Sequence, residues 1–125
     1  YRRWINRHEP KPADLARQRE YTFARGPKIS VVVPVFNPPE AFLDAMIRSV
    51  LEQTYANWEL CLADASPAPH VRPVLERYAA RDPRVKVSFL PENRGIAGNS
   101  NGALALATGH FVALLDHDDT LAPFA

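Results

Sequence analysis

The sequence predicts an α/β fold, in which a Rossmann-like parallel sheet of βα units is covered by helices on both faces. Three observations support this prediction. Four short runs are rich in apolar and β-branched residues, as buried strands are. Stretches with helical periodicity separate these runs, so strand and helix alternate three times before a last strand. Such alternation requires parallel strands joined by right-handed crossovers, which gives a three-layer α/β/α arrangement.

The first two strands and the helix between them are expected in residues 28–64. Residues 28–35, KISVVVPV, form the continuous β-branched run of a strand buried on both faces. Residues 58–64, WELCLAD, form a second apolar run. The prolines of the loop FNPPE open a helix, since proline is tolerated in a first turn. We assign the buried stripe of this helix to side chains spaced three and four apart: Phe42, Ala45, Met46, Ser49 and Val50.

The remaining elements follow the same pattern. Residues 84–90 alternate like a strand near the sheet edge, and residues 110–116 predict a buried fourth strand. A helix rich in Gly and Ala is expected within residues 93–109, with Gly109 as its C-cap. The helix expected within residues 66–83 ends at a proline and buries five side chains: Val71, Val74, Leu75, Tyr78 and Ala79.

Residues 1–27 differ from the rest of the chain because they are basic and polar and contain three prolines. Within them, residues 13–23 are expected to form a short helix. We interpret residues 1–27 as a linker or accessory segment and residues 28–125 as the domain proper.

The composition indicates one globular domain. Of the 125 residues, 46% are hydrophobic and 23% are charged, which suffices for a core and argues against general disorder. The net charge of +1 gives no electrostatic reason to expect a nucleic-acid partner. No apolar run approaches the roughly 18 residues of a transmembrane segment, and no signal-peptide core is present. The single cysteine, Cys61, cannot form a disulfide within the chain, which suits a reducing compartment. We therefore predict a cytoplasmic protein, or one attached peripherally to the inner face of the membrane.

The polar ends of the predicted strands point to a ligand site. In open parallel sheets, ligands bind beyond the carboxyl ends of the strands. Four segments follow the predicted strands and should meet at that edge: residues 34–37, 64–66, 91–95 and 116–119.

Three carboxylates, Asp116, Asp118 and Asp119, follow the last strand within four positions. Like charges this close repel unless a cation, protons or water separate them. A solvated turn that caps a following helix is one interpretation. Their place at the ligand edge favours Mg²⁺ or Mn²⁺, which bind one or two carboxylates and complete their coordination with substrate phosphates. His117, between the acids, is expected to line the site rather than to bind the metal.

Other residues at this edge have both a structural and a functional interpretation. Asp64 either caps a turn or accepts hydrogen bonds from a ribose hydroxyl or a base N–H. Residues 34–37 form an ordinary turn or offer backbone groups to a ligand. Gly95 and Gly98 open the third helix, where anions are favoured, but their spacing matches no dinucleotide fingerprint or P-loop, so close packing is preferred. Asn101 is expected to point from this helix toward the edge.

Two long stretches resemble family 2 glycosyltransferases with the GT-A fold. They are ISVVVPVFNPPEAFLDAMIRSVLEQTYANWELCLAD and PENRGIAGNSNGALALATGHFVALLDHDD, and the resemblance covers about residues 28–123. Its specific elements are VPVFN, SVLEQTY followed by NWEL, an N-x-G before a helix of small residues, and D-x-D. The resemblance implies a nucleotide-activated sugar whose glycosyl group is transferred to an acceptor hydroxyl with inversion, in the synthesis of cell-surface polysaccharide or glycan.

The resemblance also implies roles for individual residues. DHD resembles the family's D-x-D motif, which places Asp118 on a divalent metal, Mg²⁺ or Mn²⁺, and Asp116 near the metal or the ribose. The donor would be a UDP-, GDP- or dTDP-sugar, and the acceptor a saccharide or a lipid-linked saccharide. The nucleotide sugar is expected to contact Pro34, Phe36, Asn37, Asp64, Asn101, Asp116 and His117.

The sequence departs from the family pattern in two ways. Many relatives have two adjacent acids after the second strand, whereas here Ala65 follows Asp64, which leaves the role of Asp64 open. The sequence also stops after D-x-D, before the family's catalytic base and acceptor-binding half. We therefore expect residues 28–125 to be the N-terminal, donor-binding half of the domain and the base to lie beyond residue 125. The chain alone should be inactive, and its exposed sheet edge should favour self-association.

Two other functions fit part of the sequence. VALLDHDDTLA resembles the first motif of haloacid-dehalogenase-type phosphatases, in which Asp116 would be the nucleophile and Asp118 the general acid. Asp119 replaces the glycine of that motif, and the motif normally opens its domain, so the transferase is preferred. A non-catalytic nucleotide-binding module is the third hypothesis.

Overall fold

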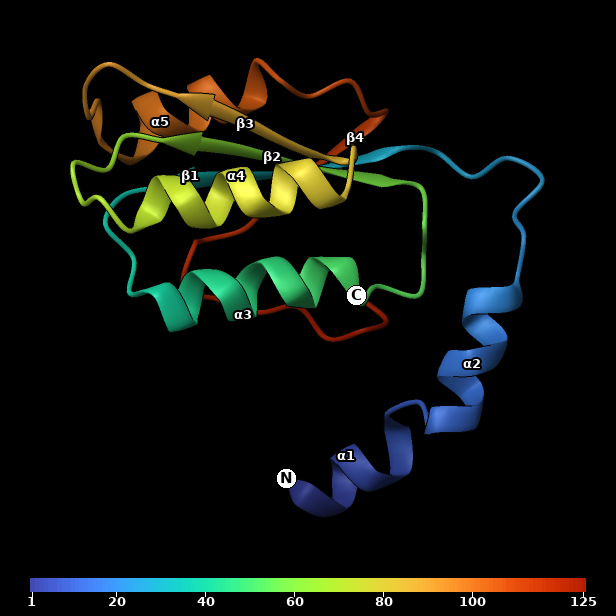
Figure 1. Ribbon diagram of the computed structural model, residues 1–125. Helices are drawn as coiled ribbons and strands as arrows, with labels where there is room; N and C mark the ends of the chain where they lie inside the picture. The colour runs from blue at the N-terminus through green and yellow to red at the C-terminus, as the bar shows by residue number, and fades with distance from the viewer.

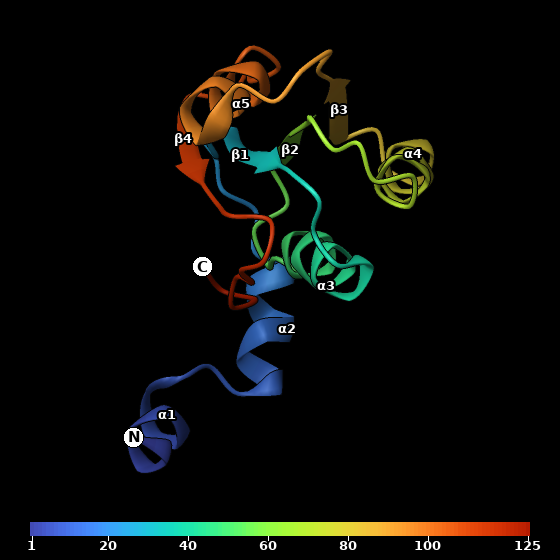
Figure 2. The same cartoon turned by 90° about the vertical axis from the view of Figure 1, so that its left-hand side faces the viewer.

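The computed structural model describes residues 1–125, except for the side chain of Asn6. Four strands form one parallel sheet: β1 (Ile29–Val35), β2 (Trp58–Asp64), β3 (Val85–Phe89) and β4 (Phe111–Leu114). Their order is β3-β2-β1-β4, so β2 and β3 lie on one side of β1 and β4 lies on the other (Figures 1 and 2). The predicted α/β fold is confirmed, and β3 lies at an edge as expected.

Helices cover both faces of the sheet. α3 (Glu40–Leu51) and α4 (Val71–Arg81) lie on one face, and α5 (Gly95–Leu104) packs on the other, against β1 and β2 (Figure 2). Val31 and Val33 belong to the larger core beneath α3 and α4, whereas Val32 packs with the smaller core beneath α5. Because β1 is covered on both faces, its sequence is a nearly continuous apolar run.

The buried stripe of α3 differs from the predicted one. Phe42 is 55% exposed and Ala45 is also exposed. The predicted and observed stripes share two residues and the same spacing, so periodicity alone does not distinguish them. The observed stripe buries two large aliphatic side chains that the prediction left out, Leu43 and Ile47. Its members are Leu43, Met46, Ile47 and Val50.

The stripe predicted for α4 is confirmed. Four of its five members are buried and the fifth, Ala79, is half-buried: Val71, Val74, Leu75, Tyr78 and Ala79.

The end of α5 differs from the prediction. The helix is capped at Ala105, and Gly109 lies beyond it, where its N–H donates to Ser30 Oγ at 2.9 Å. A Cβ at position 109 would lie 2.7 Å from the Lys28 carbonyl oxygen, so the glycine serves a close approach to the chain entering β1 rather than a helix cap.

The fourth strand is shorter and more exposed than predicted. β4 spans Phe111–Leu114, and its side chains at Phe111 and Leu114 are 61% and 78% exposed. β4 lies at the sheet edge, and α5 packs mainly on β1 and β2. The strand predicted from the apolar composition is confirmed, but its predicted burial is wrong.

Glu59 of β2 anchors a buried polar network at the amino end of the sheet. Its side chain is 1% exposed, and the Nζ atoms of Lys28 and Lys86 lie 2.7 and 2.8 Å from Oε2. Ser30 Oγ donates to Oε1 at 2.7 Å, and Thr108 donates through its backbone N–H and its hydroxyl. Burial acts to raise the pKa of Glu59, but these donors, led by Lys28, outweigh it and hold the pKa well below its usual range.

The N-terminal segment lies away from the sheet, as Figures 1 and 2 show. It contains α1 (Arg2–His8), which was not predicted, and α2 (Pro12–Glu20), which begins one residue before the expected helix region. α2 buries no side chain. The division between residues 27 and 28 remains a prediction. In the described part of the chain, no helix combines the length and apolarity needed to cross a bilayer.

Candidate functional site

A pocket of about 310 Å³ lies at the carboxyl ends of β1 and β4, beside the start of α5. Parallel α/β sheets bind ligands at this edge, so the position of the pocket as well as its shape makes it a candidate ligand site. The segments after β1, β3 and β4 contribute its lining: Pro34, Phe36, Asn93, Gly95, Ile96, Asn99, Asp116, His117 and Asp118.

Pro34 opens the sheet at this point. The pairing of β1 with β4 ends at Val32 and Leu114, two residues before the proline, which has no N–H for a further ladder bond. The Pro34 carbonyl oxygen instead lies 3.2 Å from His117 Nδ1, a distance that allows the ring N–H to donate to it. The two chain segments thus separate and make room for the pocket. Phe36, just beyond, is 41% exposed.

The three carboxylates after β4 are exposed, and they divide between two cavities. Asp116 and Asp118 line the pocket, whereas Asp119 lines a neighbouring cavity that Asp116 also borders. Within the described residues, no hydrogen bond or ion pair engages the carboxylates of Asp116 and Asp118. Water can therefore separate these charges, and both groups remain available to a cation.

The donor set suits a metal that brings other ligands with it. Across the described residues, no group of three or more His, Cys, Asp and Glu side chains could hold a metal ion. Two carboxylates alone do not make a closed cage. They do fit Mg²⁺ or Mn²⁺, which keep water and substrate phosphates in their coordination sphere.

His117 lies on the same pocket as the two acids, although strand alternation would point it the other way. The reason is local, because β4 ends at Leu114 and residues 117 and 118 form a turn. The alternation of a strand does not extend into a turn.

Two predicted site residues, Asn37 and Asp64, join the loops after β1 and β2 and do not line the pocket. Asn37 has a φ of 50°, its N–H donates to Ser66 Oγ at 2.8 Å, and its Oδ1 accepts the Ala68 N–H at 3.2 Å. Asp64 is 4% exposed, and its Oδ1 accepts the Ser66 N–H at 2.9 Å. Both side chains are used to hold the loops in shape.

The asparagine of α5 that lines the pocket is not the predicted one. Asn101 is exposed and does not line the pocket, whereas Asn99 is 2% exposed and does. Asn93 lines it as well, six residues earlier. The available sequence signal was the N-x-G segment at residues 93–95, because asparagine and glycine both favour tight turns.

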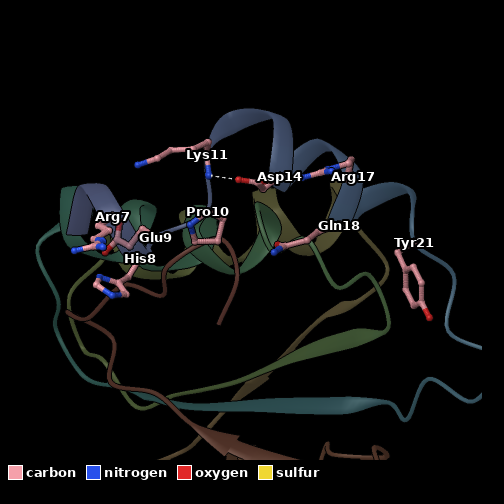
Figure 3. Close-up of a pocket in the computed structure, with 9 residues that line it drawn as sticks. All are labelled: Arg7, His8, Glu9, Pro10, Lys11, Asp14, Arg17, Gln18 and Tyr21. Carbon is pink, nitrogen blue, oxygen red and sulfur yellow. Dashed lines mark hydrogen bonds and ion pairs between the residues drawn. The ribbon is translucent and has the colours of Figure 1, made fainter. Parts of the chain in front are cut away.

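A larger cavity, about 610 Å³, lies far from this edge between α1 and α2 (Figure 3). Its lining mixes both charges, and Arg17 pairs there with Asp14 across one turn of α2. The cavity is bounded by exposed helices that stand off from the body of the molecule. Its size alone therefore does not make it the stronger candidate.

The matches to known proteins agree with the position of the pocket. Residues 30–124 match the family described as Glycosyl transferase family 2. The match includes almost all of β1 and every residue that lines the pocket. It also includes the acidic segment on which the phosphatase hypothesis was based.

Two relatives are much longer than the part of them that this chain matches. It is 57% identical over 101 residues to the uncharacterized protein y4gI of Sinorhizobium fredii, over 80% of this chain and 11% of that protein. It is 37% identical to the O-antigen biosynthesis protein RfbC of Myxococcus xanthus, over 100% of this chain and 10% of that protein. The chain thus spans about a tenth of the length of these relatives.

A solved structure supports the same assignment. Residues 1–349 of S. aureus TarS, in complex with UDP-GlcNAc, are 31% identical to this chain, with a TM-score of 0.67 over 77% of this chain and 28% of TarS 1–349. The four-stranded parallel sheet with helices on both faces is of the GT-A type. This chain belongs to glycosyl transferase family 2.

Proposed function

We propose that the chain forms the donor-binding part of an inverting glycosyltransferase that uses a nucleoside diphosphate sugar and a divalent cation. The observation that carries the proposal is the meeting of Pro34 and Phe36 with Asp116 and Asp118 on one pocket. An apolar side chain beside unengaged carboxylates suits a ligand with a flat base at one end and a metal-bound diphosphate at the other.

The roles follow from what each group offers. Phe36 and the Pro34 backbone contact the base, and Asp118 binds the cation. Asp116 binds the cation or the ribose, and His117 lines the site. Mg²⁺ or Mn²⁺ would stabilise the negative charge of the departing diphosphate.

Asn37, Asp64 and Asn101 have more distant roles in this proposal. Asn37 and Asp64 shape the loops beside the base, and the second carboxylate oxygen of Asp64 can still accept a hydrogen bond from a ribose hydroxyl or a base N–H. Asn101, exposed on α5, contacts the donor only if the donor reaches past the pocket.

The names of the relatives support the substrate class. TarS was solved with UDP-GlcNAc, and RfbC is named for O-antigen biosynthesis. We propose a UDP-, GDP- or dTDP-sugar as donor and a saccharide or lipid-linked saccharide of a surface polysaccharide as acceptor. The catalytic base is expected outside these 125 residues.

Titration calorimetry with UDP, GDP and dTDP, each with and without Mn²⁺, tests the proposal. At least one nucleotide should bind, and more tightly with Mn²⁺. Phe36→Ala should weaken that binding, whereas Phe42→Ala should not, since both phenylalanines are exposed but only Phe36 lines the pocket. Absence of binding to all three nucleotides, or equal effects of the two substitutions, would contradict it.

A further inference from the structure

The turn between β3 and α5 forms one wall of the pocket. Asn93, Gly95 and Ile96 line the same pocket as Asp116 and Asp118. The shape of the turn therefore decides how a ligand that reaches the acids is held. Several separate features fix this turn.

Asn99 contributes the hydrogen bonds. Its side chain is 2% exposed, its Oδ1 accepts the backbone N–H of Arg94 at 3.1 Å, and its Nδ2 donates to Asn93 Oδ1 at 2.9 Å. Asn93 Oδ1 also accepts the Gly95 N–H at 3.0 Å. The buried amide of Asn99 thus binds both the backbone of the turn, at Arg94, and the side chain of Asn93.

Two glycines allow the same turn. Gly95 has a φ of 71°, which a residue with a Cβ adopts only with strain. A Cβ at Gly98 would lie 2.3 Å from Arg94 Cβ, so the first turn of α5 can close only around a glycine. Hydrogen bonds, backbone conformation and packing all specify one geometry.

This network also fixes which polar group of Asn93 remains for a ligand. Backbone N–H groups only donate, so the bonds from Arg94 and Gly95 set the orientation of both amides. Asn93 Oδ1 already accepts two hydrogen bonds. Its –NH₂ group is left to bind an acceptor, such as a carbonyl oxygen of a base or a phosphate oxygen.

We propose that Asn99 is a positioning residue for the donor site, which holds the turn at residues 93–95 in its binding shape and presents the Asn93 –NH₂ group to an acceptor atom of the nucleotide. The inference rests on the proposed function of the pocket. A wall that is already ordered before binding costs less to organise when the ligand arrives.

Nucleotide binding by three variants tests this role, with the nucleotide among UDP, GDP and dTDP that the wild-type protein binds and with Mn²⁺ present. Asn99→Ala should raise the Kd about tenfold or more, because two hydrogen bonds that order the wall are lost. Leu104→Ala, at an exposed position of α5 that does not line the pocket, should leave the Kd unchanged. Ala103→Gly loosens the buried side of α5 away from the pocket, so it should lower the Tm without raising the Kd.

Amide hydrogen exchange tests the same role without a ligand. Asn99→Ala should accelerate exchange of the Arg94 and Gly95 amides about tenfold or more, whereas Leu104→Ala should not. If Asn99→Ala does not fold, Asn99→Asp replaces it. This variant keeps the acceptor for Arg94 but has no donor for Asn93, so exchange should rise more at Gly95 than at Arg94.

Three results would overturn the inference: unchanged exchange at residues 94 and 95, a Kd of Asn99→Ala within about twofold of wild type, or equal weakening by Ala103→Gly. Failure of the wild-type protein to bind any of the nucleotides would instead contradict the proposed function, and the exchange data would still show whether Asn99 holds the turn.

Discussion

Asp118 and Asp119 allow a test of the metal site at the scale of single residues. Both are exposed, but only Asp118 lines the pocket. Asp118→Asn should raise the Kd in Mn²⁺, for the nucleotide that the wild-type protein binds, at least about tenfold, because a charged metal ligand becomes neutral. Without Mn²⁺ it should change the Kd little, and the Tm should stay the same. Asp119→Asn is the control, and an equal loss of Mn²⁺-dependent affinity in both variants would contradict the assignment.

Glu59 gives a second prediction at this scale. Glu59→Gln leaves Lys28 and Lys86 without their buried carboxylate, so unfolding free energy should fall by about 3 kcal/mol. Glu92→Gln is the matched control, since Glu92 is mostly exposed and its pair with Arg94 should contribute little. Urea denaturation of both variants measures the difference. A Glu59→Gln protein as stable as Glu92→Gln would show that the network adds no net stability.

The lowered pKa of Glu59 determines how this stabilisation depends on pH. The folded-state pKa lies below the ordinary value of 4.5, so the carboxylate contributes its full stabilisation above about pH 4.5. That contribution is lost as the pH falls from 4.5 toward the folded-state pKa. In thermal denaturation between pH 7 and pH 3, the Tm of the wild-type protein should therefore fall more steeply below pH 4.5 than that of Glu59→Gln.

At the scale of elements, the sequence predicted a strand or a buried helix face correctly where its pattern allowed only one assignment. β1 and β2 were predicted with correct ends or within one residue, because their apolar runs stop at polar or turn-forming residues. The stripe of α3 was misassigned because two overlapping stripes have helical spacing. The burial of β4 was misjudged because a strand's composition does not reveal whether a helix covers it.

The residues of the site also divide into those that the sequence pattern could place and those that it could not. Pro34, Phe36, Asp116 and Asp118 could be placed together because the ends of parallel strands share an edge. Asn99 could not, since its role depends on hydrogen bonds within one turn that no periodicity reports.

Gly109 and Gly102 provide the prediction at the scale of elements. Gly109→Ala should lower the free energy of unfolding by about 1–3 kcal/mol, since its Cβ meets Ser30 Oγ and the Lys28 carbonyl oxygen, on a strand that cannot easily move. Gly102→Ala, within α5, meets only movable side-chain atoms of Leu90 at 3.0 Å or more, with the Ala63 methyl at 3.4 Å. Its stability should change by less than about 1 kcal/mol, helped by the gain in helix propensity. Equal denaturation midpoints for the two variants would contradict the role given to Gly109.

At the scale of the whole molecule, the exposed edge at β4 predicts self-association. Phe111 and Leu114 are largely exposed on a strand whose outer edge is unpaired in the described residues. Sedimentation velocity at increasing concentration should show oligomers. Leu114→Lys should reduce them, whereas Phe42→Lys, at an exposed apolar side chain of α3, should not. Identical sedimentation of the two variants would locate the contact elsewhere.

The arrangement of groups around the pocket predicts that this chain binds the donor without transferring its sugar. Transfer requires a base that takes the proton of the acceptor hydroxyl. Asp116 and Asp118 are assigned to the cation and donor, and His117 directs Nδ1 at the Pro34 carbonyl oxygen. Sugar transfer and donor hydrolysis by the 125-residue chain should therefore be undetectable beside those of a protein with the whole domain. If the chain does transfer sugar, a base lies within it, and His117→Ala is the first substitution to make because His117 Nε2 is left to act on the acceptor.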